Sequence, residues 1–222
     1  MLYLLRNSSD PKITGLKKGG TQAFVQYKES TDYFKYIRPT NETDLINSFF
    51  NEIPLKFENI NLYKNTKLTD NLSLAEGVLN GLLISEKLYN IIYHITDFHL
   101  LNVFEIKNIK YYYIKVKPIP LEKYIFNRCC FYRGTPVLKN FGKIEYIDIY
   151  NITDYLKKKN NYYNLQVESI HVIEDVTQNI IFDSLSRNFF ISDYLRSIIL
   201  NNNITGFNIL DATVYEPKIS SS

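Results

Sequence analysis

The chain carries the stretch ISEKLYNII at residues 84–92 and a second version of it, ISDYLRSII, at residues 191–199. After a loop, each copy leads into a short apolar stretch, LNVF at residues 101–104 and FNIL at residues 207–210. Serine is a favoured N-cap, and an acidic residue in the first turn suits the positive end of a helix. The repeat therefore predicts two helices that begin after Ser85 and Ser192, each followed by a strand.

Apolar residues within the repeat have helical spacing. In the first copy they fall at i, i+3, i+4 and i+7, and the second copy repeats the pattern; the residues are Leu88, Ile91, Ile92, Ile95, Leu195, Ile198 and Ile199. One apolar stripe at this spacing is typical of an amphipathic helix that packs on a core.

Turn residues follow both helices. The first helix is followed by two predicted strands, residues 100–106 and 111–116. The turn Lys107-Asn108 between these strands predicts a β-hairpin. The second leads to Thr205-Gly206, where glycine tolerates a positive φ. The sequence thus favours an α+β fold with two helix-plus-β-hairpin units packed on antiparallel or mixed sheet.

The remaining segments predict mostly strands. They comprise an opening strand at residues 1–5, further strands at 23–27, 33–37, 144–150, 167–172 and 180–182, and short helices near 41–50 and 154–159. Pro118 and Pro120 mark the best internal boundary, because proline withholds a ladder donor. We therefore predict a single domain over residues 1–222 with two sublobes, approximately 1–117 and 118–222.

Bulk properties restrict the class of protein. The 222 residues include 45% hydrophobic and 22% charged residues, and the formal net charge is +3. Such a balance lacks the dense basic field of an obligate nucleic-acid binder. Residues 1–6 do not resemble a secretory signal, and the most apolar long stretch, residues 89–104, is interrupted by polar side chains. Cys129 and Cys130 are adjacent, which disfavours a long-range disulfide. The prediction is a cytoplasmic protein with no membrane or nucleic-acid partner.

Motifs for reaction chemistry are weak. His94 and His99 are five residues apart, which is not a metal-ligand spacing on a helix, and His171 has no evident triad partner in the sequence. The two cysteines are better explained as buried side chains than as reactive thiols. Carboxylates such as Glu145, Asp148 and Glu168 fit a solvated sheet face, and Gly15–Thr21 lacks the lysine of a phosphate-binding loop. We predict no catalytic residue, no cofactor and no metal.

Tyrosines are the candidate contact residues for a protein partner, because tyrosine supplies a rigid apolar body with a polar tip. Tyr111 and Tyr113 lie in a predicted strand in which at least one of three consecutive tyrosines must face outward. Tyr162 and Tyr163 follow the basic run Lys157–Lys159, a mixture also seen in single-strand nucleic-acid binders. A helix end with exposed tyrosines is the favoured interpretation of this run. For the tyrosines in general, core packing or scattered surface positions are favoured over a role in partner contact.

Several of these segments together resemble the myxobacterial-type immunity proteins of bacterial polymorphic toxin systems. They are LISEKL at 83–88, FEI at 104–106, YYYI at 111–114, FISDYL at 190–195 and ITGF at 204–207. In that family a similar helix start precedes a strand hairpin, and a Thr-Gly turn closes the chain. The resemblance spans residues 83–214, with Asp193 in place of the usual glutamate and a shorter loop before Ile204.

The resemblance implies a small cytoplasmic protein that binds the toxin domain encoded beside it and blocks it by occlusion, without catalysis. Ser85, Ser192 and Gly206 are then caps and a turn that belong to the fold and not to the toxin contact. Two other hypotheses stay open: an enzyme or nucleic-acid-processing protein whose site forms only in space, and a structural subunit of a larger assembly. The oligomeric state is left open.

Overall fold

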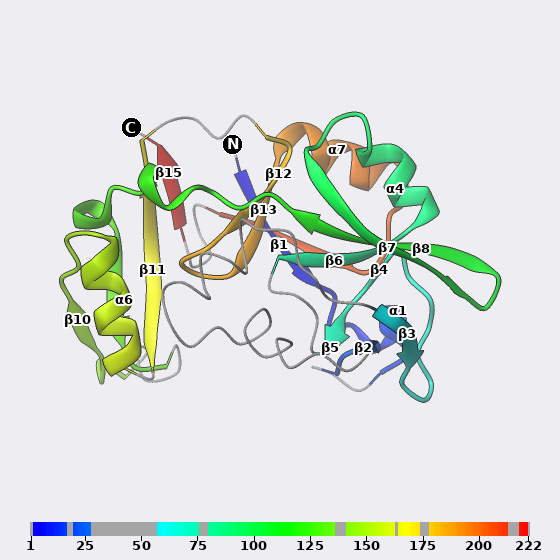
Figure 1. Ribbon diagram of the computed structural model, residues 1–222, viewed down its shortest axis with the longest axis horizontal. Coiled ribbons are helices and arrows are strands. Elements are labelled where there is room, and N and C mark those ends of the chain that lie inside the picture. Colours follow the sequence, from blue (N-terminus) through cyan, green and yellow to red (C-terminus); the bar gives the residue numbers. More distant parts are fainter. Residues whose placement is uncertain are drawn as a thin grey trace.

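The computed structural model describes residues 2–16, 20–27, 57–75, 80–135, 141–162, 164–173, 178–212 and 218–221. This part of the chain is a mixed α+β fold made mostly of strands (Figure 1), so the predicted fold class is confirmed at this level. Its helices are α1 (Pro11–Thr14), α4 (Glu86–Ile92), α6 (Ile152–Asn161) and α7 (Asp193–Asn201), with 3-10 turns η1 (Leu121–Lys123) and η2 (Phe126–Arg128). None of the helices described is long and apolar enough to cross a membrane.

The described strands form four sheets. Sheet 1 has the order β4 (Asn71–Leu72), β6 (Gly81–Ser85), β8 (Ile109–Val116), β7 (Phe98–Ile106). Sheet 2 has the order β12 (Ile180–Asp183), β13 (Asn188–Ser192), β1 (Leu2–Asn7), β14 (Phe207–Asp211). Sheet 3 is β3 (Phe57–Leu62), β2 (Ala23–Tyr27), β5 (Leu74–Ala75), and sheet 4 is β10 (Glu145–Ile147), β9 (Cys130–Arg133), β11 (Leu165–Val172), β15 (Lys218–Ser221).

Sheets 1 and 2 have the same topology. In each, an outer strand (β4 or β12) pairs with the strand that leads into a helix (β6 or β13), and the helix (α4 or α7) carries the chain to the opposite edge (β7 or β14). Every pairing in both sheets is antiparallel. The strands before and after each helix therefore run in the same direction with one strand between them. The sequence repeat marks a repeated strand–helix–strand unit, and α4 and α7 lie side by side (Figure 1).

The strand that fills the central position differs between the two units. In sheet 1 it is β8, which the turn at Lys107-Asn108 joins to β7 as the predicted hairpin, and both turn residues have positive φ. In sheet 2 it is β1, from the other end of the chain. The prediction of a hairpin in the second unit is therefore wrong, because β14 pairs with β1. The predicted sublobe boundary at residues 117 and 118 also fails to separate the sheets, since β1 lies inside sheet 2.

Ser85 and Ser192 are the N-caps of α4 and α7, as predicted, and they occupy corresponding positions in the two copies of the repeat. The Ser85 hydroxyl accepts a hydrogen bond from the Leu88 N–H at 3.3 Å, and the Ser192 hydroxyl accepts one from the Leu195 N–H at 3.1 Å. Each serine also donates to the side chain of the residue just before the outer strand of its own sheet. Ser85 donates to Asp70 at 2.8 Å, and Ser192 donates to Asn179 at 2.7 Å.

Asp70 and Asn179 each reach across to the other unit. The Asp70 carboxylate accepts from the Thr205 N–H at 2.9 Å and from its hydroxyl at 3.0 Å, in the loop after α7. The Asn179 amide donates to the Ile95 carbonyl oxygen at 2.5 Å, in the loop after α4. Each unit thus contacts the other through the residue that accepts the hydrogen bond of its capping serine. The two contacts are reciprocal.

Gly206 lies at this junction. Its φ is +95°, and a Cβ atom there would lie 2.2 Å from the Asn71 carbonyl oxygen and 2.9 Å from the Asn71 nitrogen. The Gly206 carbonyl oxygen accepts the Ser8 N–H at 2.8 Å. The predicted turn is confirmed, and glycine is needed there for space as well as for backbone conformation.

The hydrophobic core has two parts, and β8 contributes to both. Ile114 and Val116 lie in the larger cluster, which extends from α4 and α7 through sheet 2 to α6 and sheet 4. Tyr111 and Tyr113 lie in the smaller cluster, which is shared by sheets 1 and 3. Side chains alternate along a strand, so a strand buried on both faces serves two clusters.

Most of the other predicted helices and strands have the same type in the structure. Strands are present at the start of the chain and within residues 23–27, 165–172 and 180–183, and the helix at 154–159 extends over 152–161 with Asn151 as its N-cap. The strand predicted at 144–150 is confined to β10. The strand predicted at 33–37 and the helix near 41–50 fall outside the described residues.

Candidate functional site

Among the described residues, the largest set of contacting aromatic rings with exposed members lies on α4 and the β7–β8 hairpin. We define the aromatic surface as Tyr89, Tyr93, Phe98, Leu100, Val103 and Tyr112. Tyr89 is at its centre: its ring stacks on Tyr112 with 3.8 Å between centroids and meets Tyr93 at 5.4 Å and Phe98 at 5.7 Å. Tyr89 lies on α4, and Tyr93, four residues later, is the C-cap of this helix, so the two side chains share one helical face.

Three members of the aromatic surface are exposed. The exposed fraction is 54% for Tyr93, 40% for Leu100 and 43% for Val103. Leu100 pairs with Ile114 and Val103 pairs with Tyr112, so both project from the same face of the hairpin although they are three residues apart. An irregularity in the ladder between Leu100 and Asn102 inserts the extra residue that makes this possible.

Ion pairs flank the aromatic surface on both sides. Glu86 lies 3.8 Å from the Lys110 ammonium and accepts the Tyr112 hydroxyl at 3.3 Å. Asp97 lies 3.1 Å from the Lys117 ammonium. An apolar centre with aromatic side chains and a charged rim is the usual composition of a protein–protein interface. This part of the molecule is therefore suited to bind another protein.

The four tyrosines predicted as contacts do not form this surface. Tyr111 and Tyr113 are fully buried in the smaller core cluster, where Tyr111 donates to the Thr69 carbonyl oxygen at 2.7 Å and Tyr113 packs edge-on against Phe57 at 5.2 Å. Their prediction as contact residues is wrong, because sheet 3 covers that face of β8. Tyr162 is half-buried with the Arg133 guanidinium 5.4 Å from its ring centroid, and Tyr163 falls outside the described residues.

Tyr112 lies on the opposite face of β8 from Tyr111 and Tyr113, where it is half-buried at the edge of the larger core cluster. The sequence shows that one face of the strand must hold Tyr111 and Tyr113 and the other Tyr112, but it does not show which face packs against α4. The pair Tyr89 and Tyr93, at helical spacing and away from the stripe Leu88, Ile92, is the signal that would have located the surface.

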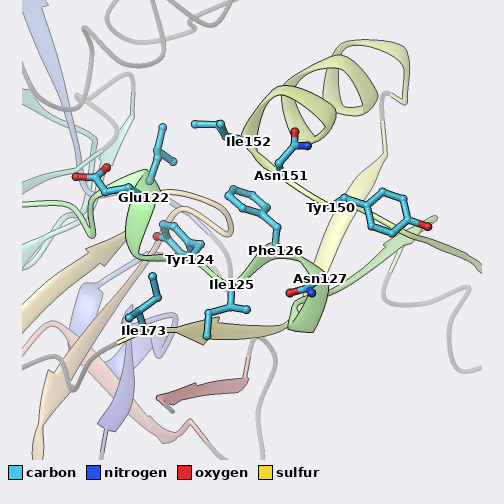
Figure 2. Close-up of a pocket in the computed structure, with 10 residues that line it drawn as sticks. Glu122, Tyr124, Ile125, Phe126, Asn127, Tyr150, Asn151, Ile152 and Ile173 are labelled. Atoms are coloured by element: carbon cyan, nitrogen blue, oxygen red, sulfur yellow. The ribbon is translucent and has the colours of Figure 1, made fainter.

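A pocket of about 760 Å³ lies at the other end of the molecule, between the η1–η2 segment and the start of α6 (Figure 2). Its lining is mainly apolar, with a few polar side chains among them: Leu121, Glu122, Tyr124, Ile125, Phe126, Asn127, Tyr150, Asn151, Ile152 and Ile173. This size falls within the range of small-molecule sites.

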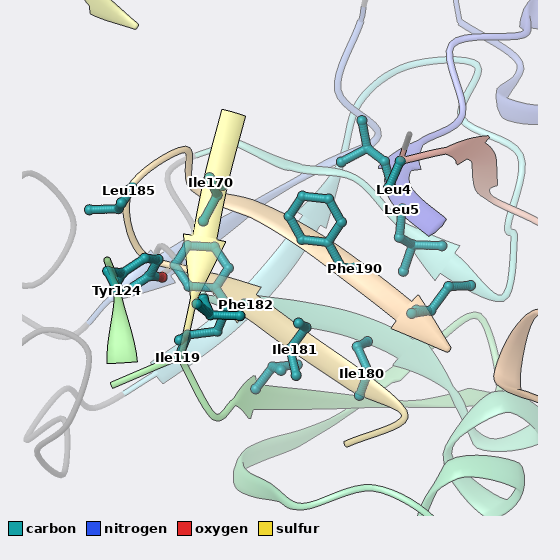
Figure 3. Packing of buried hydrophobic residues seen from close by; sticks show 14 of the residues in the cluster. Leu4, Leu5, Ile119, Tyr124, Ile170, Ile180, Ile181, Phe182, Leu185 and Phe190 are labelled. Carbon is teal, nitrogen blue, oxygen red and sulfur yellow. The ribbon is translucent and has the colours of Figure 1, made fainter. Parts of the chain in front are cut away.

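A buried polar network lies behind the Tyr124 ring of this pocket. Asp183 is fully buried and accepts hydrogen bonds from the Tyr124 hydroxyl at 2.7 Å, the Ser186 N–H at 2.7 Å, the Leu185 N–H at 3.3 Å and the Ser186 hydroxyl. Tyr124, Leu185 and Phe182 lie together in the core at this point (Figure 3). Four donors occupy the carboxylate, so its role is to hold the β12–β13 turn against the pocket wall.

Lys159 borders this network, and its pKa leads us to expect that the stability of the folded protein depends on pH. Its ammonium donates to the Tyr155 hydroxyl at 2.8 Å. Burial, with a smaller contribution from Arg187 and against the opposing effect of Asp183, lowers the pKa of Lys159 to about 7. In the unfolded chain the pKa is near 10.5. Between these values the unfolded state holds the proton and the folded state does not, so stability rises with pH across this window.

We therefore expect Lys159→Met to stabilise the protein at pH 6.5 and to gain less relative to wild type at pH 9. Urea unfolding at the two pH values measures this. Burial also lowers the pKa of Lys115, to about 8, so a shallower slope remains in the variant. Lys157→Met, an exposed change on the same helix, is the control. If Lys159→Met changes stability equally at both pH values, the assignment of the pH dependence to Lys159 is wrong.

The histidines and cysteines do not form a metal site within the described residues. In the ranges that the structure describes, no three His, Cys, Asp or Glu side chains lie together as metal ligands. His94 and His99 are exposed. Burial raises the pKa of Cys129 to about 11, which keeps its thiol protonated at neutral pH, and both cysteines are partly buried.

In the basic run Lys157–Lys159, two of the three lysines contact other side chains of the protein. The Lys158 ammonium pairs with Asp154 at 3.0 Å, one helical turn earlier, and lies 5.7 Å from the Tyr150 ring centroid. Lys159 binds Tyr155 as described above. This favours the interpretation as a helix end over that of a nucleic-acid contact.

Comparison of the chain with models of known protein families, with curated proteins and with solved structures gives no match. The likeness to immunity proteins therefore rests on the sequence motifs quoted above.

Proposed function

We propose that this protein is an immunity protein of a polymorphic toxin system, which binds a cognate toxin domain in the cytoplasm and neutralises it by occlusion, without catalysis. The aromatic surface is the contact in this proposal. The observation that carries it is the group formed by exposed Tyr93, Leu100 and Val103 around the Tyr89–Tyr112 stack. The motif resemblance supports the choice of partner.

Rigid aromatic side chains at the centre of an interface typically carry most of its binding energy. Tyr89 and Tyr112 are held by their mutual stack, and Tyr112 is also held by Glu86, so little side-chain freedom is lost on binding. The ion pairs at the rim give specificity and faster association more than affinity. This arrangement supports stoichiometric binding.

Tyr93→Ala is expected to weaken toxin binding at least about fivefold, because tyrosine is enriched among the interface residues whose truncation to alanine costs more than about 1 kcal/mol. The measurement is the dissociation constant, by calorimetry, for the toxin domain encoded beside this protein. Tyr194→Ala is the matched control, since Tyr194 is 59% exposed against 54% for Tyr93 and lies on α7, the corresponding helix of the other unit. Equal effects of the two variants would place the contact elsewhere.

A further inference from the structure

The pocket in Figure 2 has an apolar body with polar groups at its two ends. Tyr124 and Phe126 form its buried wall, with ring centroids 6.0 Å apart, and the exposed side chain of Ile173 borders it. Glu122 lies at one end, and Asn127 and Tyr150 lie at the other (Figure 2). The pocket is far from the aromatic surface along the molecule, so it is a separate feature.

The described residues of the pocket lining carry a negative charge. Among them Glu122 is the one charged side chain, and no cation of the described part of the chain lies at ion-pair distance from it. Lys158, near Tyr150, is neutralised by Asp154. Glu122 is exposed, so its carboxylate changes rotamer rapidly and can turn over the pocket.

We propose that this pocket binds a small organic cation with an apolar body, of the class of aryl-alkyl primary amines. The apolar part contacts Tyr124, Phe126 and Ile173, and the ammonium pairs with the Glu122 carboxylate. The Glu122 carboxylate attracts the ammonium and repels an anionic group, so the pocket prefers the cation. This activity goes beyond toxin neutralisation and does not depend on it.

The probes are 4-phenylbutylamine, the neutral 4-phenylbutanol and the anionic 4-phenylbutyrate, each titrated into the full chain without a toxin. Shifts of the backbone amide NMR signals of Phe126, Asn127 and Ile173 report binding. We expect saturable shifts with the amine, an affinity about threefold higher than for the alcohol as for a partly exposed ion pair, and weaker binding still of the carboxylate.

Two variants locate the charge. Glu122→Gln is expected to reduce the affinity for the amine to that for the alcohol, while Glu105→Gln, an exposed acidic residue on β7, leaves the preference unchanged. Ile173→Lys, at an exposed position, is expected to abolish amine binding without loss of the folded spectrum. The proposal is overturned if the amine gives no saturable shifts, if the carboxylate binds as tightly as the amine, or if Glu122→Gln keeps the preference. None of these outcomes affects the toxin-binding proposal, because no toxin is present.

Discussion

Gly206→Ala is expected to destabilise the folded protein by at least about 3 kcal/mol, at the upper end of single-residue effects. Two costs add. A residue with a side chain is strained at a φ of +95°, and its Cβ would lie 2.2 Å from the Asn71 carbonyl oxygen. The obstacle is backbone of β4, so relief requires the two strand–helix–strand units to move apart. Urea unfolding followed by far-ultraviolet circular dichroism measures the loss.

Gly142→Ala separates these two costs. Gly142 also has a positive φ, +65°, but no atom of the described residues lies within 4 Å of the position of its Cβ. Only the backbone strain remains there, about 1–2 kcal/mol. If the two variants lose the same stability, the close approach of Gly206 to Asn71 does not hold the units together.

Leu4→Ala is expected to cost about 3–5 kcal/mol, the range for a leucine truncated in a close-packed core. Leu4 is fully buried in the centre of β1, where it pairs with Phe190 on one side and Leu210 on the other. Figure 3 shows Leu4 close to Leu5 and Phe190 in the core. The loss would show that the strand at the start of the chain stabilises a sheet otherwise made of residues 180–211.

Leu200→Ala serves as the control for this variant. Leu200 is an exposed leucine on α7, and its truncation is expected to cost less than about 1 kcal/mol. Denaturant midpoints of the two variants, compared at equal unfolding slope, give the difference. A small effect of Leu4→Ala would contradict the central position of β1 in sheet 2.

The helices of the repeat could be predicted because their signals are local. Ser85 and Ser192 cap within three residues, and the apolar stripes depend on spacing alone. The partner of β14 could not be predicted in this way. Residues 207–211 pair with residues 3–7, about two hundred positions away, and in the corresponding unit the same position is filled by an adjacent hairpin strand.

The aromatic surface was harder to predict than the fold. The choice between Tyr112 and its two neighbours depends on which face of β8 meets sheet 3, and sheet 3 is built from residues before position 76. Val103 and Leu100 share a face through a ladder irregularity, which leaves no strong mark in the sequence. The burial of Tyr111 and Tyr113 and the shared face of Leu100 and Val103 both depend on contacts between segments that are distant or irregularly paired, which local sequence patterns do not reveal.

The shared topology of sheets 1 and 2 separates the architectural from the functional part of the repeat. Both units keep the capping serine, its acceptor and the contact to the other unit. Tyr93, by contrast, lies just after α4, and the side-chain cluster of Tyr89, Phe98 and Tyr112 belongs to the first unit. The capping contacts maintain the fold, and in the proposed function the binding surface has been built on one unit only.

Co-expression with the toxin domain encoded beside this protein tests the central claim most directly. The prediction is that cells producing both proteins grow, that the toxin co-purifies with this protein in a stoichiometric complex, and that Tyr93→Ala weakens this protection while Tyr194→Ala does not. The immunity function is contradicted if the toxin remains active and fails to co-purify while this protein is present in folded form.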